Sequence, residues 1–287
     1  MAIQSICVQL NSDSAVAPYA EYAIKMADIH KAEVCGLFVQ GEPQNMHAID
    51  FSGPSVGDPN SVAALVDEAH DQARREIKKQ TQTINTEIAK VSRQYDKSFP
   101  WRSVSGSVKD AISRESQFQD LVIVTKHNRD NKLFNIRSTT AVDVAISSAC
   151  PILAIPDSNH ASFLKRPLAV WDGSEASART LKMAMPLLQK AESFGLVFKP
   201  KGEEPLDIDN SEQRVLHWLA LQGLNPSRPN TEANNNFVDQ IIALLDGEIY
   251  DSVIVGAHGH SHVSDLLFGS ALRSIWENTK VPVYTYH

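Results

Sequence analysis

Cysteine is scarce in this chain: Cys7, Cys35 and Cys150 are the three among 287 residues. Three cysteines cannot form a paired disulfide framework, and their spacing matches no CxxC metal or redox motif. We therefore expect three buried, reduced thiols in a cytoplasmic protein.

Long hydrophobic runs and basic clusters are also missing. No apolar run approaches the roughly 20 residues of a membrane-spanning helix, and the start lacks the basic residues of a signal peptide. The net charge is −7 and neither half is basic, whereas nucleic-acid binders need cations to displace counterions from phosphates. The sequence therefore predicts no membrane and no nucleic-acid partner. With 43% hydrophobic and 21% charged residues, it is typical of a globular protein of one large or two smaller domains.

The chain contains an internal repeat. Residues 122–155 align with 253–286 without a gap, so that Asp120 corresponds to Asp251 and Pro151 to Pro282. The apolar stretch before Asn11 likewise matches the stretch before Asp172. The repeat predicts two tandem domains, 1–157 and 167–287, joined by a linker at 158–166.

Each copy alternates short apolar strands with amphipathic helices. In the second copy, strands are expected at 168–171, 194–198, 252–255 and 282–286. The first copy follows the same order, with a long helix expected at 61–95 after a loop at 41–60. This alternation predicts an α/β fold in which helices cover both faces of a parallel sheet.

A glycine motif follows the strand at 252–255. It reads Gly256-x2-Gly259-x9-Gly269-Ser270. Glycines let backbone N–H groups approach a phosphate, and we expect Gly269-Ser270 to open a helix whose N-terminus favours an anion. The alternative is a turn and a helix start without a ligand.

In this context the motif resembles the nucleotide-binding signature of the universal stress protein family, as does Val170-Trp-Asp172-Gly173-Ser174 after the first strand of the same copy. The resemblance extends over nearly the whole chain. It implies two Rossmann-like domains, each a five-stranded parallel sheet with helices on both faces. It also implies that ATP lies across the carboxyl ends of the first and fourth strands, at the switch point of the sheet.

The resemblance assigns a role to each matching position. Asp172, Gly173 and Ser174 would line the adenosine end, and Phe198 would offer its backbone to adenine. Gly256, His258 and Gly259 would hold the ribose and phosphates, and Gly269, Ser270 and Ala271 the outer phosphates. Mg or Mn would be carried mainly by the nucleotide, because no carboxylate cluster is spaced to bind it.

The first copy departs from this pattern. Asn11, Thr125, Asn128 and Ser138 replace Asp172 and the three glycines, and Thr139 alone keeps the hydroxyl. Because Cβ atoms at these positions would crowd a phosphate, we expect this degenerate copy not to bind ATP in the family manner. Its loop is nevertheless basic, with Lys126, Arg129, Lys132 and Arg137, so another anion is an alternative.

Three alternating histidines, His258, His260 and His262, lie within the glycine motif. Alternate residues of an extended segment point the same way, and imidazole suits zinc, copper or nickel. Three roles stay open for these histidines: they lie in a loop near solvent or phosphate, they contact the ligand directly, or they bind a metal. The spacing alone supplies no fourth metal ligand.

The sequence contains no P-loop, no GxGxxG fingerprint and no GxSxG elbow. We therefore expect ATP to act as a regulatory ligand in a stress-response protein; the rivals are a slow ATP hydrolase using the same cleft and a nucleotide-free adaptor. The resemblance further implies that the last strands of the two copies, 150–156 and 281–286, pair to make an intrachain pseudo-dimer. Association into a homodimer stays open.

Overall fold

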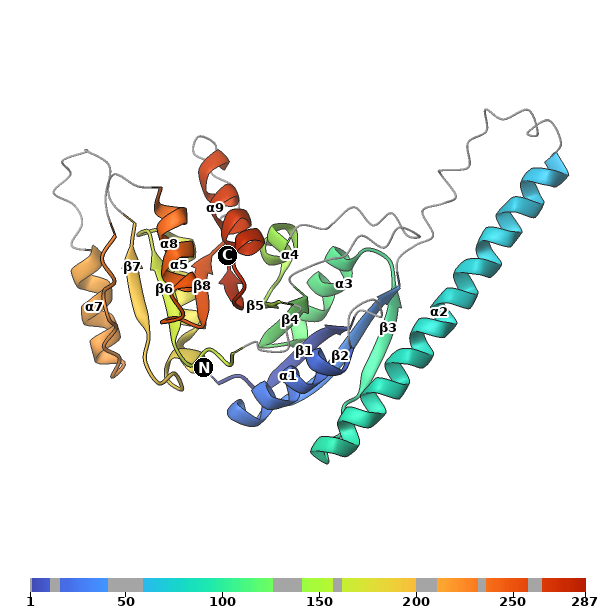
Figure 1. The fold of residues 1–287 in the computed structure, drawn as a ribbon, viewed down its shortest axis with the longest axis horizontal. Coiled ribbons are helices and arrows are strands. Elements are labelled where there is room, and N and C mark those ends of the chain that lie inside the picture. Colours follow the sequence, from blue (N-terminus) through green and yellow to red (C-terminus); the bar gives the residue numbers. More distant parts are fainter. Residues whose placement is uncertain are drawn as a thin grey trace.

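The computed structural model describes residues 2–10, 16–40, 59–125, 141–156, 162–199, 211–231, 236–257 and 265–287. The strands of these residues form one continuous sheet in the order β3-β2-β1-β4-β5-β9-β8-β6-β7 (Figure 1). The elements of the first half are β1 (Ser5–Leu10), α1 (Val16–His30), β2 (Glu33–Gln40), α2 (Pro59–Tyr95), β3 (Trp101–Ser105), α3 (Val108–Glu115), the 3₁₀ turn η2 (Ser116–Phe118), β4 (Leu121–Thr125), α4 (Ala141–Ser147) and β5 (Ile152–Ile155). Those of the second half are β6 (Pro167–Trp171), α5 (Glu175–Met183), α6 (Met185–Leu188), β7 (Gly195–Phe198), α7 (Ser211–Leu221), α8 (Phe237–Asp246), β8 (Ser252–Gly256), α9 (Asp265–Asn278) and β9 (Val283–Tyr286).

The two halves share one strand register. On β4, Val122 faces Cys7 of β1 and Ile152 of β5. On β8, the aligned Val253 faces Leu168 of β6 and Val283 of β9. The register therefore follows the alignment that the sequence repeat gives.

The halves meet where β5 and β9 pair antiparallel, with Leu153 opposite Tyr284 (Figure 1). The other strand pairs are parallel. The pairing expected for the two last strands is thus present within one chain, and each half covers the other's sheet edge. An uncovered edge would offer unpaired N–H and C=O groups to other chains.

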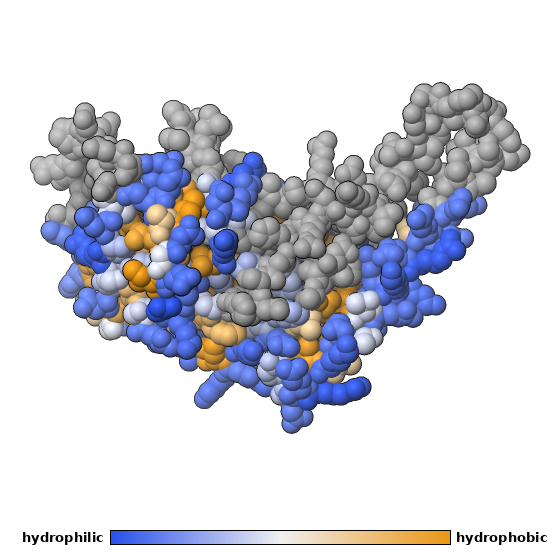
Figure 2. All heavy atoms as spheres, viewed as in Figure 1, coloured by the Kyte–Doolittle hydropathy of each residue, from blue (hydrophilic) through white to orange (hydrophobic). Residues whose placement is uncertain are grey.

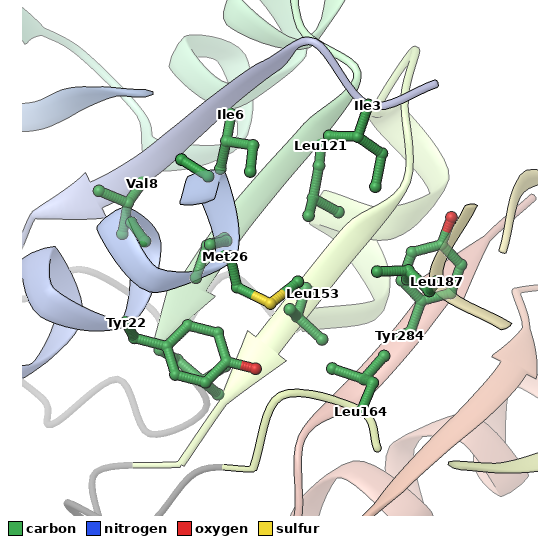
Figure 3. Close-up of a cluster of buried hydrophobic side chains, with 14 of the residues drawn as sticks. Ile3, Ile6, Val8, Tyr22, Met26, Leu121, Leu153, Leu164, Leu187 and Tyr284 are labelled. Carbon is green, nitrogen blue, oxygen red and sulfur yellow. The ribbon is translucent and has the colours of Figure 1, made fainter. Parts of the chain in front are cut away.

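The second part of the predicted linker packs into the interior between the halves. Leu164 is buried, and the Phe163 ring stacks on Tyr22 of α1 with centroids 4.8 Å apart. The Tyr22 hydroxyl also donates to the Ser162 carbonyl oxygen at 2.7 Å. Figure 3 shows Leu164 close to Tyr284 in the same apolar cluster. These residues therefore fix the junction; residues 158–161 lie outside the described part.

The outer edge of the second half differs from the five-stranded expectation. Its described residues contain four strands, and beyond β7 a single parallel bridge joins Gly195 to Ser227 where the first half has β3. Pro226 and Pro229 flank Ser227. Because proline has no N–H to donate to a ladder, a full strand does not form there.

Helices cover both faces of the sheet, as the alternation predicts. Core residues from α1, α2, α5, α6 and α7 gather on one face, and those from α3, α4, α8 and α9 on the other. The 37-residue α2, about 55 Å long at 1.5 Å per residue, extends beyond the sheet (Figure 1) and matches the long helix expected at 61–95. On the face shown in Figure 2, the described residues are mostly hydrophilic, with scattered hydrophobic patches. Within the described helices, none has the length and apolarity needed to cross a bilayer.

Candidate functional site

A cavity of about 250 Å³ lies at the carboxyl ends of β6 and β8 in the second half. Its walls come from both strands, from the chain after β7, and from α5, α8 and α9. The lining residues are Val170, Asp172, Ser177, Lys199, Asn236, Phe237, Val238, Ile241, Val255, Gly256, Leu272 and Ile275. The crevice beyond the carboxyl ends of the strands is where open α/β sheets bind ligands.

The lining of the cavity is mostly apolar with a few polar residues. Valine, isoleucine, leucine and phenylalanine side chains make up the apolar part, whereas Asp172, Ser177, Lys199 and Asn236 are polar. The Lys199 backbone N–H donates to the Trp171 carbonyl oxygen at 2.9 Å, which holds the lysine beside β6. The Asn236 side chain caps α8 by accepting from the Val238 N–H at 3.0 Å. An apolar body with a few placed polar groups is the usual make-up of a small-molecule site.

Asp172 and Ser174 organise the turn from β6 into α5. The Asp172 carboxylate accepts the Ser174 N–H at 3.0 Å, and the Ser174 hydroxyl accepts the Ser177 N–H at 3.1 Å as the N-cap of α5. Of these two predicted adenosine contacts, Asp172 lines the cavity and Ser174 is a helix cap.

Gly173 stands in the same turn with a φ of +79°, in the left-handed region. It lines a second cavity of about 400 Å³ on the opposite face of β6, together with Trp171, Lys182 and Trp218. The structure therefore separates Gly173 from Asp172, although both were predicted to touch adenosine.

Replacing Gly173 by alanine is expected to lower the free energy of unfolding by about 1 kcal/mol, because a Cβ is disfavoured at positive φ. Gly173→Asn is the matched control. Because asparagine adopts this conformation more readily, this variant should lower the free energy of unfolding by less than Gly173→Ala does. Urea denaturation measures both. Equal stability of Gly173→Ala and the parent would contradict the assignment of strain to this turn.

Gly256, the first glycine of the motif, also lines the cavity, and the structure gives it a packing role. A Cβ at this position would lie 2.8 Å from the Ala176 carbonyl carbon and 2.8 Å from the Ser177 nitrogen, both main-chain atoms of α5. Close approach of α5 to the end of β8 therefore requires glycine here before any ligand is considered.

Phe198 ends β7, as expected. Its ring packs with the core on the side of α7, and the Arg228 guanidinium lies 5.0 Å from the ring centroid. The predicted adenine contact through its backbone stays a prediction.

The start of the last helix is where the sequence prediction was wrong. Helix α9 begins at Asp265, so Gly269, Ser270 and Ala271 lie inside the helix and do not form its N-terminus. An acidic residue at the first helical position is favoured by the helix dipole, which the sequence prediction overlooked. His258, Gly259, His260 and His262 lie outside the described residues, as do Asn11, Asn128, Ser138 and Thr139 and the basic loop of the first half.

Sequence reasoning did not single out several lining residues. Lys199 carries the one cationic side chain of the described lining, and Asn236 and Val238 begin α8. Asn236 had a readable signal, because asparagine is a preferred N-cap residue. Nothing local marked Lys199. Among the described residues, no group of three His, Cys or carboxylate ligands gathers at this cavity. The divalent cation carried by the nucleotide stays a prediction.

Comparison with known proteins shows a family match in the second half and a shared fold over the whole chain. Residues 164–287 match the model of the universal stress protein family. A universal stress protein from Archaeoglobus fulgidus DSM 4304 superposes with a TM-score of 0.62 at 16% identity, over 99% of this chain and 97% of that chain. A functionally unknown protein from Pseudomonas aeruginosa PAO1 gives a TM-score of 0.58 at 14% identity, over 99% and 92%. None of the curated proteins matches significantly. The chain therefore carries a universal stress protein domain in residues 164–287, and over its full length it has the fold of a universal stress protein.

Proposed function

We propose that the second half binds an adenine nucleotide, ATP, as a regulatory ligand in the cavity at the carboxyl ends of β6 and β8, in a protein of the stress response. The observation that carries this proposal is the position of the cavity: Asp172 and Gly256, from two predicted nucleotide segments, line one cavity at the sheet crevice. The cavity, of about 250 Å³, suits a nucleoside-sized body, with the phosphates extending beyond it.

The lining suggests how each part of the nucleotide is held. The apolar lining residues Val170, Val255 and Ile241 would pack against adenine, because a flat ring gains most from apolar contact on its faces. The Asp172 carboxylate can accept from a ribose hydroxyl, and the Lys199 ammonium offers positive charge to a phosphate. When bound, ATP supplies negative charge and a divalent cation to this edge of the sheet. Any conformational shift is limited by its differential affinity for the two states.

Lys199→Glu is expected to weaken ATP binding by about tenfold, since it replaces attraction to a phosphate by repulsion, roughly 1.4 kcal/mol. Lys182→Glu is the matched control: it makes the same charge change at the cavity on the opposite face of β6 and should leave the affinity near that of the parent. Isothermal titration with Mg-ATP measures both. If both variants weakened ATP binding equally, the change in net charge would explain the loss of affinity, and this site would be contradicted.

The regulatory proposal also predicts binding without rapid turnover. Asp172 is the one carboxylate in the described lining, and its carboxylate already accepts the Ser174 N–H. No second carboxylate of that lining stands ready to deprotonate water. Incubation of the protein with radiolabelled Mg-ATP should therefore return intact ATP. Multiple turnovers would favour the hydrolase, and failure to retain any nucleotide would favour the adaptor.

A further inference from the structure

Two cysteines far apart in the sequence face each other in the first half. Cys7 of β1 and Cys35 of β2 are direct partners in the register of parallel neighbours, so their side chains share one face of the sheet (Figure 1 shows the two strands side by side). Their sulfur atoms and a carboxylate oxygen of Glu115, the last residue of α3, all lie within 4.8 Å of one another. Both cysteines are free thiols.

A cation stands beside this pair. Arg102 of β3 forms an ion pair with Glu115, and the Gln119 side chain donates to the other carboxylate oxygen of Glu115 at 2.9 Å. Glu115 is 4% exposed. A buried carboxylate needs partners that compensate its charge, and Arg102 and Gln119 supply them. A bound metal cation would have to displace Arg102 from its carboxylate ligand and tolerate the guanidinium charge nearby. The arrangement therefore favours a pair of reactive thiols over a metal site.

The two thiols are electrostatically different. The hydrogen bond with the Cys7 thiol has the largest effect on Cys35 and lowers its pKa. Partial burial opposes this, and the charge of Arg102 adds a smaller lowering. The pKa of Cys7 is raised, by the same hydrogen bond and by burial. Cys35 is thus the thiol of the pair that loses its proton more readily, and a thiolate is the nucleophilic form of cysteine.

The two thiols also differ in solvent exposure, and this difference likewise favours Cys35 as the reactive one. Cys7 has no exposed surface, whereas Cys35 is only partly buried; the Arg102 side chain, whose charge acts on Cys35, is exposed. A small oxidant can therefore reach Cys35 before Cys7. Cys150 shares this face of the sheet but is buried, and desolvation raises its pKa to about 12.

We propose that Cys35 and Cys7 form a peroxide-oxidisable dithiol, in which Cys35 is the attacking thiol and Cys7 the resolving thiol. The Cys35 thiolate attacks a hydrogen peroxide oxygen; the O–O bond breaks, Cys35 becomes a sulfenic acid, and hydroxide leaves and takes up a proton. The Cys7 sulfur then attacks the Cys35 sulfur, and the sulfenic oxygen leaves as water with the Cys7 proton. Overall, two thiols and one hydrogen peroxide give one disulfide and two waters.

The fold permits this disulfide without separating the strands. Neighbouring strands lie about 4.8 Å apart, within the Cα–Cα range of about 4.4–6.8 Å found for disulfides. The bond would link β1 to β2 near the centre of the first half. A cytosolic disulfide of this kind is typically a transient, redox-sensing one.

The experiment uses the reduced full-length protein, treated with hydrogen peroxide, alkylated and analysed by intact-mass spectrometry and peptide mapping. When alkylation follows denaturation, we expect one alkyl group per oxidised chain instead of the three of the reduced chain, and a Cys7–Cys35 linked peptide. Cys7→Ala should trap a dimedone-reactive sulfenic acid on Cys35, Cys35→Ser should form no disulfide, and Cys150→Ala should behave as the parent. Arg102→Gln should slow oxidation about tenfold, as a rise of one unit in the thiol pKa would, and Arg102→Lys should restore most of the rate.

Three outcomes would overturn the proposal. The first is peroxide leaving both thiols free in the folded parent protein at concentrations that oxidise free cysteine. The second is dimedone labelling Cys150 in preference to Cys35. The third is a stoichiometric zinc ion in the purified parent that blocks oxidation of both thiols, which would make the cluster a metal site. Because the parent protein itself gives the disulfide readout, a variant that fails to fold does not decide the result.

Discussion

Gly256→Ala is expected to lower the free energy of unfolding by about 2 kcal/mol, although it adds a single methyl group. The new Cβ would lie 2.8 Å from main-chain atoms of Ala176 and Ser177 in the first turn of α5. Backbone atoms cannot rotate away as a side-chain end can, so the helix itself must move, and overpacking of this kind costs roughly 1–3 kcal/mol. Urea denaturation followed by tryptophan fluorescence measures the change.

Gly247→Ala is the matched control for this substitution. Gly247 has a φ of −71°, and a Cβ there meets only the Ala243 and Leu244 carbonyl oxygens at 3.6 Å, an ordinary contact. Alanine should therefore be neutral or slightly stabilising, through the smaller conformational entropy of the unfolded chain. Because the nucleotide is not needed for this difference, its appearance in the ligand-free protein assigns Gly256 to helix packing. Equal stability of both variants would contradict that assignment.

The first half shows why this glycine matters in only one of the two copies. Thr125 occupies the aligned position at the end of β4, where it is buried with a full Cβ. The helix after β1 begins at residue 16, five positions after Asn11, whereas α5 begins at residue 175, three positions after Asp172. In the second copy the first turn of α5 lies against the strand end, where a Cβ on Gly256 would meet main-chain atoms of Ala176 and Ser177. The glycine that the sequence prediction assigned to phosphate binding is therefore also part of the fold.

Sequence reasoning succeeded where local patterns carry the information. The repeat placed Asp120 and Asp251 at matching positions, and in the structure their N–H groups donate to the equivalent Ser5 and Arg166 carbonyl oxygens at 3.1 and 3.0 Å. Proline is a boundary signal of the same local kind: α5 ends at Met183, and α6 carries Pro186 in its first turn. Short-range patterning fixes the order of elements, and a repeated pattern fixes repeated pairing.

The same reasoning missed features that depend on which elements become neighbours. Cys7 and Cys35 match no spacing motif, yet the pairing of β1 with β2 brings their thiols together. Lys199 has no local signal because its place at the cavity follows from the pairing of β7 with β6. The sequence prediction placed the start of the helix containing Gly269 too late, because it gave the glycine pattern more weight than the acidic residue Asp265, where the helix begins.

Tyr284→Ala is expected to destabilise the protein by about 3–5 kcal/mol, the usual range for truncating a large buried aromatic ring. Tyr284 is 1% exposed and lies on β9 opposite Leu153 of β5, where the two halves join. Figure 3 shows its ring beside Leu187 and near Leu164, so that one side chain contacts elements from both halves and the linker. Its removal should therefore weaken the junction more than either separate core.

Calorimetry distinguishes a loss of coupling between the unfolding of the two halves from a simple loss of stability. In the parent protein we expect one unfolding transition, whereas Tyr284→Ala should unfold in two steps, with a calorimetric enthalpy larger than the van't Hoff value. Ile24→Ala is the matched control, because Ile24 is fully buried in α1 and away from the β5–β9 pair; it should cost about 2–5 kcal/mol and lower the stability of the first half without weakening the junction.

ATP adds a second readout to this pair of variants, because a ligand that binds only the folded second half stabilises whatever unfolds together with that half. In the parent, ATP should raise the midpoint of the single transition. In Tyr284→Ala it should raise only the transition of the second half and leave the first half at its own midpoint. If ATP shifted both transitions of Tyr284→Ala equally, the coupling between the halves would run through contacts other than the β5–β9 junction.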